Sequence, residues 1–370
     1  MKNLRVLIFT ESFAPHTQTF VYNDAVGLSK NNQVMVACLE RQNTEKFPFE
    51  NVKVLEYKRN WLSQKLWSRL YLYDLKMSYK NRKFTKQLSF ITQTFKPDII
   101  HCHFGPESLM IFDNLEGLNI PVIVNLHGYD ASSLVQKSKI YSHRLKKLFQ
   151  ASNIFPTATS KSLLDHLNTK GIISENSRPI YSGVDTEFFK RVQPQPKGVP
   201  FIFLQVAGLR EKKGHIYTLK AFKKFLSVCG KDSSVLIFVG SGEREPELKS
   251  LCEKLGIKSQ VFFEGWASPE QVKLYIEKTN YFIHPSITPF SGDMESTTIA
   301  IMEAMSMELP IIATYHSGIP EIVENEKHGI LVEEKNVSQY VSAMQRILDW
   351  ELQPQNRQQI IDNFSQKKRI

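Results

Sequence analysis

Two glutamates eight positions apart mark the part of the sequence best suited to chemistry. Glu295 and Glu303 lie in the segment His284–Met305, which reads HPSITPFSGDMESTTIAIMEAM. This pattern predicts an irregular polar loop and then a helix over Thr297–Met307, with Glu303 about two turns beyond Glu295. A carboxylate between apolar neighbours, as Glu303 is, is costly to leave unpaired. We therefore predict a binding role for both glutamates. The alternative is a helix cap followed by an ordinary surface helix.

The residues that follow Glu295 are suited to an anion. Ser296, Thr297 and Thr298 fit the first turn of the predicted helix, where free backbone amides and the positive end of the helix dipole favour a phosphate. A second, weaker phosphate-loop signal is Gly240-Ser-Gly242, which lies between a predicted strand and a predicted helix. An ordinary tight turn explains those glycines equally well.

A histidine in the first half of the chain is a further candidate. His127 precedes Gly128 at the end of a predicted strand, where a polar side chain can reach a ligand. A loop histidine bonded to the backbone is the alternative. We expect His101 and His103, on the preceding strand, to be packed or hydrogen-bonded and not both to line a site.

Strands and helices must alternate along the chain to position these residues. Short apolar runs separated by segments of helical spacing indicate crossover connections and mainly parallel sheets with helices on both faces. In the first half, strands are predicted at Arg5–Phe9, Val34–Cys38, Val52–Tyr57, Asp98–His101, Val122–Leu126 and Asn153–Phe155, and helices at Phe20–Ser29, Leu62–Phe95 and Lys139–Ala151.

The pattern breaks at Gln193–Pro200 (QPQPKGVP) and then begins again. Three prolines and a glycine without apolar periodicity predict a linker there. The strands expected after it are Phe201–Val206, Ser234–Val239, Val261–Phe263, Tyr281–His284, Pro310–Ala313 and Gly329–Val332; the helices are Ile216–Val228, Glu245–Leu255, Pro269–Lys278, Thr297–Met307 and Val337–Leu348.

We therefore predict an α/β protein with two doubly wound, Rossmann-like domains, residues 1–195 and 196–370. The last twenty or so residues are expected to pack back on the first domain. Open parallel sheets bind ligands beyond the carboxyl ends of their strands, so the two domains are expected to face a shared cleft.

The composition is that of a soluble globular protein. Of 370 residues, 42% are hydrophobic and 23% charged, and no run of about 18 apolar residues predicts a membrane span. The apolar run after Arg5 is too short for a signal peptide. The four cysteines have no CxxC spacing, so we expect reduced thiols in a cytoplasmic protein and no zinc site.

The net charge of +10 is confined to the first half. Residues 1–195 hold 26 Lys and Arg against 16 Asp and Glu, whereas residues 196–370 hold 21 of each. The segment Lys58–Lys86 alone has nine basic residues and one acidic residue, with Trp61 and Trp67 near its start. It predicts an interfacial helix on an anionic bilayer; a core-facing helix with a solvated basic face is the alternative.

The glutamate segment resembles the E-x7-E signature of the retaining family-4 glycosyltransferases of the GT-B fold. In the first half, two motifs look like those of members that build bacterial exopolysaccharide, such as the colanic-acid type. The resemblance covers nearly the whole chain. The matching segments are Ile100–Gly105 (IHCHFG), His127–Asp130 (HGYD), Tyr181–Phe189 (YSGVDTEFF), Val206–Gly214 (VAGLREKKG), Pro310–Val323 (PIIATYHSGIPEIV) and Gly329–Val332 (GILV).

The resemblance implies a role for each candidate. Glu303 would hold the ribose of a nucleotide-sugar donor, Glu295 the donor sugar, and Ser296–Thr298 the diphosphate. Arg210 and Lys213 would neutralise the departing diphosphate, and His127 would reach the reacting sugar. Fixed cations and helix-end amides stabilise charge that develops as a sugar–phosphate bond breaks. Gly240 and Gly242 would belong to the donor site, and so would Gly265, beside Trp266 at the nucleotide base.

Two departures from the family pattern stand out. The usual diphosphate arginine falls two residues before Arg210, at Gly208, so Arg210 or Lys213 would have to replace it. The segment Pro15–Thr19 lacks the glycines that the family often has after the first strand, which puts its acceptor contacts in doubt. The chain has no D-x-D pair, so no metal and no cofactor is expected.

Three other functions compete with this one. A dehydrogenase is disfavoured because no G-x-G-x-x-G follows the first strand. A nucleotide-sugar epimerase has the same architecture, and a basic nucleic-acid-binding protein would explain the first half but not the neutral second half. We therefore expect a glycosyltransferase that acts on a glycan or lipid-linked acceptor, in the cytoplasm and peripherally on the inner face of the membrane.

Overall fold

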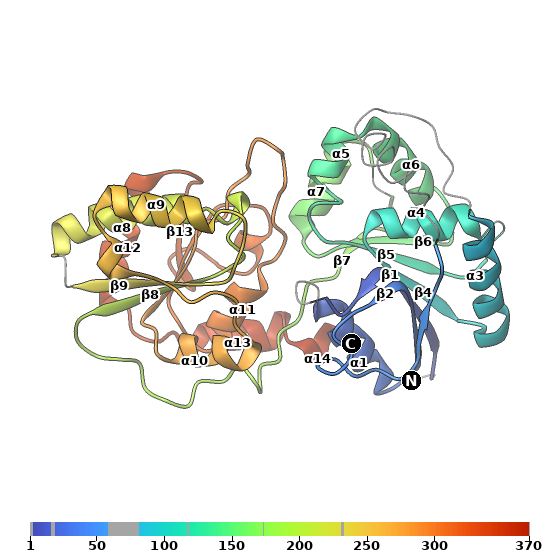
Figure 1. The fold of residues 1–370 in the computed structure, drawn as a ribbon, viewed down its shortest axis with the longest axis horizontal. Helices are drawn as coiled ribbons and strands as arrows, with labels where there is room; N and C mark the ends of the chain where they lie inside the picture. The colour runs from blue at the N-terminus through green and yellow to red at the C-terminus, as the bar shows by residue number, and fades with distance from the viewer. Residues whose placement is uncertain are drawn as a thin grey trace. The chain divides into compact units, whose positions relative to one another are not determined.

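The computed structural model describes residues 3–15, 19–57, 81–115, 117, 119–172, 174–230 and 233–369. The chain forms two compact units, residues 1–180 and residues 181–369 (Figure 1). Each has its own parallel sheet between helices. The prediction of two α/β domains is therefore confirmed.

The first unit is built on a seven-stranded sheet in the order β3-β2-β1-β4-β5-β6-β7, with every neighbouring pair parallel. Because β1 lies in the interior of the order, the chain runs first to one edge of the sheet and then to the other. The strands are β1 (Arg5–Phe13), β2 (Gln33–Arg41), β3 (Val52–Val54), β4 (Ile99–His103), β5 (Val122–Leu126), β6 (Ile154–Ala158) and β7 (Arg178–Pro179).

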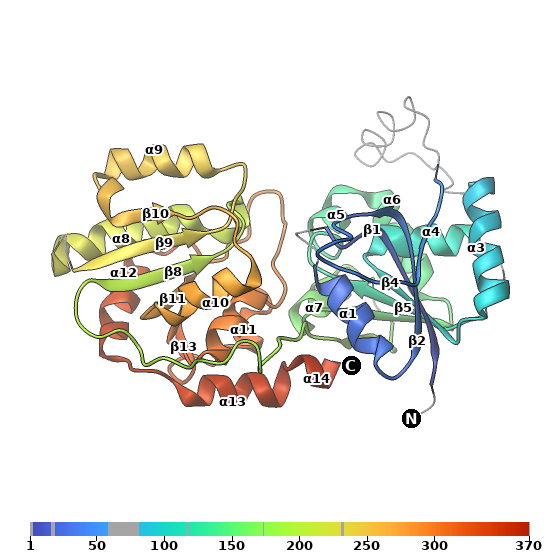
Figure 2. The same ribbon diagram turned by 60° about the horizontal axis from the view of Figure 1, so that its bottom comes forward.

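Helices cover both faces of this sheet. α4 and α6 pack against each other on the face opposite α1 (Figures 1 and 2). The helix predicted over Leu62–Phe95 is described only in its second part, as α3, because residues 58–80 lie outside the described ranges. The helices are α1 (Thr19–Ser29), α3 (Arg82–Phe95), α4 (Gly105–Asn114), α5 (Ser133–Lys137), α6 (Lys139–Phe149) and α7 (Lys161–Thr169).

The second unit has a six-stranded parallel sheet in the order β10-β9-β8-β11-β12-β13. Every residue of the three strands β11 to β13 is buried, as expected for strands covered on both faces. The strands are β8 (Phe201–Val206), β9 (Ser234–Val239), β10 (Val261–Phe263), β11 (Tyr281–His284), β12 (Ile311–Thr314) and β13 (Gly329–Val332).

Two hydrophobic cores lie on the two faces of the second sheet. α8, α9 and α12 cover one face, with Phe222 and Tyr340 in its core, and α10, α11 and α13 cover the other, with Met302 and Ile360 (Figure 1). The helices are α8 (His215–Cys229), α9 (Glu245–Leu255), α10 (Pro269–Glu277), α11 (Ile299–Ser306), α12 (Val337–Arg346), α13 (Pro354–Asn363) and α14 (Gln366–Arg369), with 3-10 turns η1 (Glu211–Lys213), η2 (Lys258–Gln260), η3 (Ile319–Glu321) and η4 (Ile347–Asp349).

The boundary between the units differs from the predicted one at residue 195. The compact units divide after Ile180, so residues 181–195 belong to the second unit. The reason is Arg191, whose guanidinium donates hydrogen bonds to the carbonyls of Met307, Glu277 and Ile276 at 2.9–3.0 Å. These bonds satisfy backbone carbonyls at the carboxyl ends of α10 and α11. The proline pattern of the linker gives no sign of them.

The end of the chain packs on the second unit. α13 contacts α11, and the Asn356 amide donates to the carbonyls of Leu309 and His328 at 2.9 and 2.8 Å. Residues up to 369 belong to this unit. The expectation that the last twenty or so residues also pack back on the first domain stays a prediction.

Two further sequence predictions concern the cysteines and the membrane. All four cysteines are free; Cys38, Cys102 and Cys252 are buried and Cys229 is half-buried. Among the helices that the structure describes, none has the length and the apolar character needed to cross a bilayer.

Candidate functional site

The loops that follow the strands of the second sheet bring the predicted donor-site residues together. Parallel strands have their carboxyl ends at one edge, so residues far apart in sequence meet there. The segment after β8 (207–214) and the segment after β11 (285–298) are bonded directly, because the Ile287 amide donates to the Lys212 carbonyl at 2.8 Å. Gly214 approaches this loop so closely that a side chain there would clash with the Pro285 carbonyl.

Glu295 is ion-paired to two lysines. Its Oε2 lies 2.6 Å from Nζ of Lys213, and its Oε1 lies 3.1 Å from Nζ of Lys212. Burial would raise the pKa of Glu295, which is 9% exposed, but the two lysine charges outweigh burial and hold the pKa well below its usual value. Glu295 is therefore a fixed anion between two fixed cations.

Lys212 is a further residue of the candidate site, which the sequence did not single out. Its ammonium also lies 3.1 Å from Oδ1 of Asp293. Burial lowers the pKa of Lys212, but Glu295 and Asp293 together raise it above the usual value. The signal was present as the Lys212-Lys213 pair in the GLREKKG segment, but the resemblance points to Lys213 only.

Glu303 has the opposite environment. It lies in α11, half-buried, and no hydrogen bond or ion pair joins its carboxylate to another of the described residues. Burial alone raises its pKa to about 7. A carboxylate with unused acceptor capacity at this edge of the sheet is suited to the hydroxyl groups of a ligand.

The helix after Glu295 begins later than predicted. α11 starts at Ile299 with Thr298 as its N-cap, so Glu295 stands in the loop four residues before the helix. Ser296, Thr297 and Thr298 are all buried, and the Thr298 hydroxyl has no hydrogen-bond partner within the described chain. The amide groups of this turn therefore lie at a helix start, as predicted, but shifted by two residues.

Two buried histidines stand beside the lysine pair. Burial, assisted by the charge of Lys213, lowers the pKa of His215 to about 3 and that of His284 well below its usual value. Their ring nitrogens have no hydrogen-bond partner in the ranges that the structure covers. Both rings are therefore neutral, and they add no positive charge to the site.

The glycines of the predicted phosphate loop are needed for packing. A Cβ at Gly240 would lie 2.0 Å from the carbonyl oxygen of Ala207, and one at Gly242 would lie 2.5 Å from that of Leu209. The loops after β8 and β9 are thus in backbone contact, and the Leu209 amide donates to Ser241 at 3.0 Å. Gly265, with φ +70°, accepts a hydrogen bond from the Gly240 amide at 2.7 Å. Donor binding by these glycines stays a prediction.

Arg210 and Trp266 are both accessible. Arg210 is exposed directly before η1, and its guanidinium forms no hydrogen bond or ion pair with another described residue. A Cβ at Gly208 would meet only the Ser241 carbonyl, at 3.6 Å. Trp266 is 50% exposed, so it is not a core residue.

His127 lies at the carboxyl end of β5 in the first unit and belongs to a histidine cluster. Its Nε2 lies 3.2 Å from Nδ1 of His103, whose Nε2 is 3.7 Å from the Asp24 carboxylate. The rings of His101 and His103 are 4.4 Å apart. The two rings therefore lie on the same face of the sheet, as residues two apart on a strand do, and whether both line a site stays untested.

The loop after His127 is fixed by a buried carboxylate. Asp130 accepts hydrogen bonds from the amides of His127, Gly128 and Gly105 at 2.9, 3.2 and 2.9 Å. Burial raises the pKa of Asp130 although these three bonds oppose the shift. The backbone of His127 is therefore held in place from α4 as well as from its own loop.

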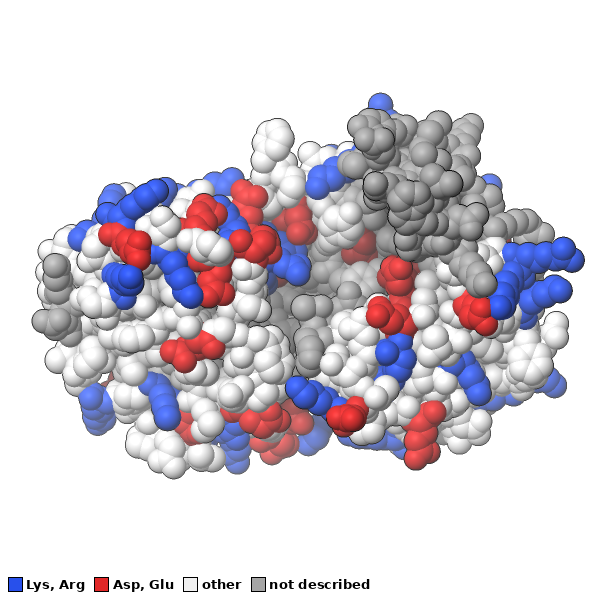
Figure 3. All heavy atoms as spheres, viewed as in Figure 1, with Lys and Arg blue, Asp and Glu red and all other residues white. Residues whose placement is uncertain are grey.

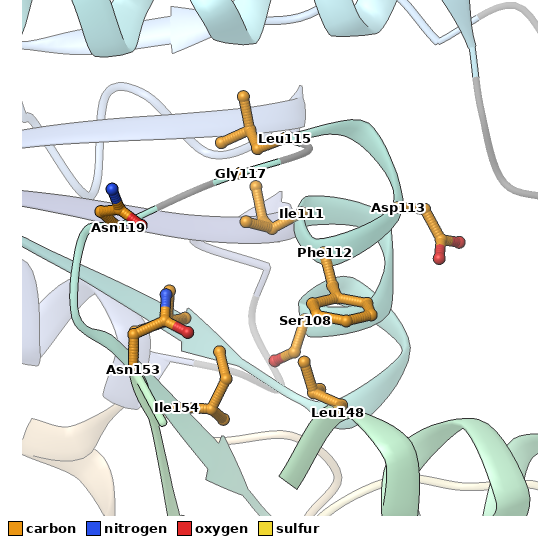
Figure 4. Close-up of a pocket in the computed structure, with 11 residues that line it drawn as sticks. Ser108, Ile111, Phe112, Asp113, Leu115, Gly117, Asn119, Leu148, Asn153 and Ile154 are labelled. Atoms are coloured by element: carbon orange, nitrogen blue, oxygen red, sulfur yellow. The ribbon is translucent and has the colours of Figure 1, made fainter. Parts of the chain in front are cut away.

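A cavity in the first unit lies away from these residues. It has a volume of about 370 Å³ and is lined by Ile111, Phe112 and Leu115 from the end of α4 and by Asn153 and Ile154 at the start of β6 (Figure 4). His127 stands at the other end of the neighbouring strand, so the cavity is not part of the candidate site. Within the described ranges no cluster of His, Cys, Asp and Glu has the composition of a metal site, and the expected absence of a metal requirement stays a prediction.

Comparison with known proteins decides the family. Residues 17–188 match the family model "Glycosyltransferase Family 4", and residues 186–367 match "Glycosyl transferases group 1". The chain belongs to the glycosyltransferase family. The family resemblance predicted from the E-x7-E segment and its companion motifs is confirmed.

Several glycosyltransferases are similar to this one in sequence. A protein of Salmonella typhimurium whose name assigns it to colanic acid biosynthesis is 31% identical over 66% of this chain and 60% of its own length. An amylovoran biosynthesis glycosyltransferase of Erwinia amylovora is 29% identical over 68% of this chain and 62% of its own length. The glycosyltransferase described here thus spans about three fifths of these relatives.

Solved structures share the fold of this glycosyltransferase at low sequence identity. A glycosyltransferase from Rickettsia africae has a TM-score of 0.77 with 16% identity, covering all of this chain and 96% of its own. The Anabaena protein HepE in complex with UDP has a TM-score of 0.73 with 15% identity, covering 99% and 97%. These likenesses confirm the predicted GT-B type of fold.

Proposed function

We propose that this protein transfers a sugar from a nucleotide-sugar donor to a glycan or lipid-linked glycan acceptor, in the synthesis of exopolysaccharide or another cell-surface glycan. The observation that carries the proposal is the contrast between the two glutamates. Glu295 is neutralised by Lys213 and Lys212, whereas Glu303 has a carboxylate with no partner among the described residues. One carboxylate is thus positioned for chemistry and the other is left for a ligand.

The donor is assigned to the carboxyl edge of the second sheet. Glu303 accepts hydrogen bonds from the ribose hydroxyls, and the amides at Ser296–Thr298 face the diphosphate. Lys213 is shared between Glu295 and the departing diphosphate, and Arg210, exposed beside it, supplies a second cation. In this proposal the fixed cations stabilise the negative charge that a metal ion stabilises in other transferases, so no metal is required.

The reacting sugar is assigned to Glu295 and His127. As the bond to the diphosphate breaks, the sugar ring becomes cationic, and a carboxylate and an imidazole near the ring orient it and tolerate that charge. The likeness to the retaining family-4 enzymes supports retention of the anomeric configuration. Gly240 and Gly242 keep the loops around the donor close-packed, and Gly265 supplies a backbone turn of positive φ beside them.

The relatives support the substrate classes. The Anabaena structures hold UDP or UDP-glucose, and an Escherichia coli relative, 25% identical over 74% of this chain, is named for UDP-Gal and a GlcNAc-diphosphoundecaprenol acceptor. We propose the same classes here, a nucleoside-diphosphate sugar and a lipid-linked or polymeric glycan. With a lipid-linked acceptor, the enzyme would act in the cytoplasm at the inner face of the membrane.

A screen of nucleotide sugars followed by product analysis tests the proposal. A donor present at 100 times its dissociation constant adds about 2.7 kcal/mol to the stability, which a thermal-shift assay detects. The donor that binds is then incubated with lipid-linked and soluble glycans, and NMR of the product gives the anomeric configuration. Formation of an α-linked glycoside from an α-linked donor is expected. Nucleotide release with an altered free sugar and no glycoside would indicate an epimerase instead.

A further inference from the structure

A buried histidine connects the Glu295 loop to the ends of two neighbouring strands. His316 follows β12 and is fully buried. Its Nε2 accepts a hydrogen bond from the Glu295 amide at 2.9 Å, and its Nδ1 lies 2.6 Å from Oε1 of Glu334, which follows β13. The backbone of a candidate site residue is therefore bonded to a side chain rather than to a strand or helix.

The hydrogen-bond partners of His316 indicate which ring nitrogen carries the proton. A backbone amide can only donate, so Nε2 must carry the lone pair, and the single ring proton of the neutral imidazole must be on Nδ1. That proton is donated to Glu334, and a carboxylate can accept it. Burial would raise the pKa of Glu334, but the bonds from His316 and from the Thr288 amide outweigh burial and lower it. Each donor in this chain thus meets one acceptor.

Glu334 holds both ends of the loop that carries Glu295. Its Oε2 accepts a hydrogen bond from the Thr288 amide at 2.7 Å, near the start of the loop. Its Oε1 receives the His316 proton, and His316 in turn holds Glu295 near the end of the loop. Among the described residues, the titratable ones that meet His316 are Glu334, Glu295 through its backbone amide, and His284.

We propose that His316 and Glu334 are positioning residues that set the backbone of Glu295 so that its carboxylate meets Lys212 and Lys213. The proposal rests on the proposed function, in which the Glu295 carboxylate acts on the donor sugar. Neither His316 nor Glu334 is assigned a contact with the donor. Their effect is on the placement of Glu295. When a buried donor loses its acceptor, the equilibrium constant for the bonded arrangement typically falls by a factor of roughly 5 to 150.

Hydrogen exchange of the Glu295 amide tests the link without any assay of sugar transfer. In the unaltered protein this amide should exchange slowly, measured by mass spectrometry on a peptide spanning residues 290–298. His316→Leu should speed its exchange at least about tenfold. His316→Gln should keep it slow, because one amide group can both accept from Glu295 and donate to Glu334.

The chain offers a matched control at His328. This histidine is also buried and also accepts a hydrogen bond from a backbone amide, that of Glu324, but it lies outside the Glu295 loop. His328→Leu should leave the exchange of the 290–298 peptide unchanged. If His328→Leu speeds that exchange as much as His316→Leu does, the faster exchange comes from general loosening of the unit, and the proposal is overturned.

Kinetics then separates positioning from simple stability. His316→Leu should lower kcat about tenfold or more while UDP or another nucleoside diphosphate binds within about threefold of the normal Kd, and His316→Gln should recover most of the rate. Should His316→Leu fail to fold, Glu334→Ala replaces it, since Glu334 is partly exposed and its removal leaves the core intact. Glu334→Ala should show the same rapid exchange and the same fall in kcat.

Two results would overturn the proposal. One is a folded His316→Leu or Glu334→Ala protein with slow Glu295 exchange and normal kcat. The other is His316→Gln as impaired as His316→Leu. If the unaltered protein transfers no sugar at all, the proposed function fails, and the exchange experiment still decides whether His316 and Glu334 hold Glu295.

Discussion

Nζ of Lys213 lies 2.6 Å from Oε2 of Glu295, in a contact between the loop after β8 and the loop after β11. The two residues are 82 positions apart in sequence. Because both side chains are largely buried, their attraction is screened less than that of a surface pair. Lys212 makes a second contact with the same carboxylate, so the loss of one lysine does not leave Glu295 without a cation.

Lys213 should contribute more to catalysis than the exposed Arg210. Lys213→Ala is expected to lower kcat/KM by roughly 100- to 1000-fold, the range typical of a lost electrostatic stabiliser. Arg210→Ala should cost much less, because its side chain is exposed. Steady-state kinetics of both single variants and the double variant measures their coupling. If Arg210→Ala is neutral in both backgrounds, Arg210 does not replace the arginine missing at Gly208.

Glu303 and Glu295 should have separable effects. Glu303→Gln is expected to weaken donor binding, whereas Glu295→Gln and His127→Ala should mainly lower kcat. Isothermal titration with the donor and steady-state rates give the two quantities. Near-normal rates and affinities for all three variants would contradict the site assignment.

The raised pKa of Glu303 makes a further prediction about stability. Burial raises this pKa from 4.5 to about 7, so the folded protein binds more protons than the unfolded chain between those two values. Stability from this group is therefore present below pH 4.5 and is lost as the pH rises through 7. Without donor, Glu303→Gln should be more stable than the unaltered protein at pH 8, by on the order of 1–3 kcal/mol, and no more stable at pH 4.5. Thermal unfolding at the two pH values measures the difference.

The glycine at the end of β9 should tolerate no side chain. Gly240→Ala places a methyl group 2.0 Å from the Ala207 carbonyl at a φ of +138°, so the two loops must separate. We expect a loss of about 2 kcal/mol or more in the free energy of unfolding. Gly208→Ala is the matched control, because its Cβ meets only one atom at 3.6 Å and should cost less than about 1 kcal/mol. Equal losses for both variants would contradict the close approach of these loops.

The basic residues of α3 should contribute to membrane attachment. Arg82, Lys83 and Lys86 are exposed in the first turns of α3, and Lys and Arg side chains gather over this helix in Figure 3. The other basic residues of the segment, from Lys58 to Lys80, lie outside the described residues. Each cation near an anionic bilayer contributes about 1 kcal/mol, so changing all three to Gln should reduce co-sedimentation with anionic vesicles roughly 100-fold and leave donor binding intact.

The same vesicle experiment has an internal control. Attachment should fall at high salt, because the attraction is screened within a Debye length. Vesicles without anionic lipid should not retain the protein. If the unaltered protein ignores anionic vesicles even at low ionic strength, the acceptor is soluble or reaches the enzyme by another route.

Local pattern in the sequence was enough to predict the two parallel sheets and most of their helices. Strands such as Phe201–Val206 and Val122–Leu126 were predicted at the residues where they occur, because the strands of a covered parallel sheet are mostly apolar. The same reasoning placed α11 only to within two residues, since Ser and Thr can cap a helix from several positions. The two glutamates could be identified from the sequence because they lie in one short segment, eight positions apart.

Only the tertiary structure decided which of these groups have partners. Glu295 and Glu303 look alike in sequence, yet one is held by two lysines and the other by no side chain among those described. His316 and Glu334 gave no signal, because each acts through a residue on another loop. The strand order β8-β11-β12-β13 brings those loops to one edge of the sheet, and that order is set by packing over the whole unit rather than by any short stretch of sequence.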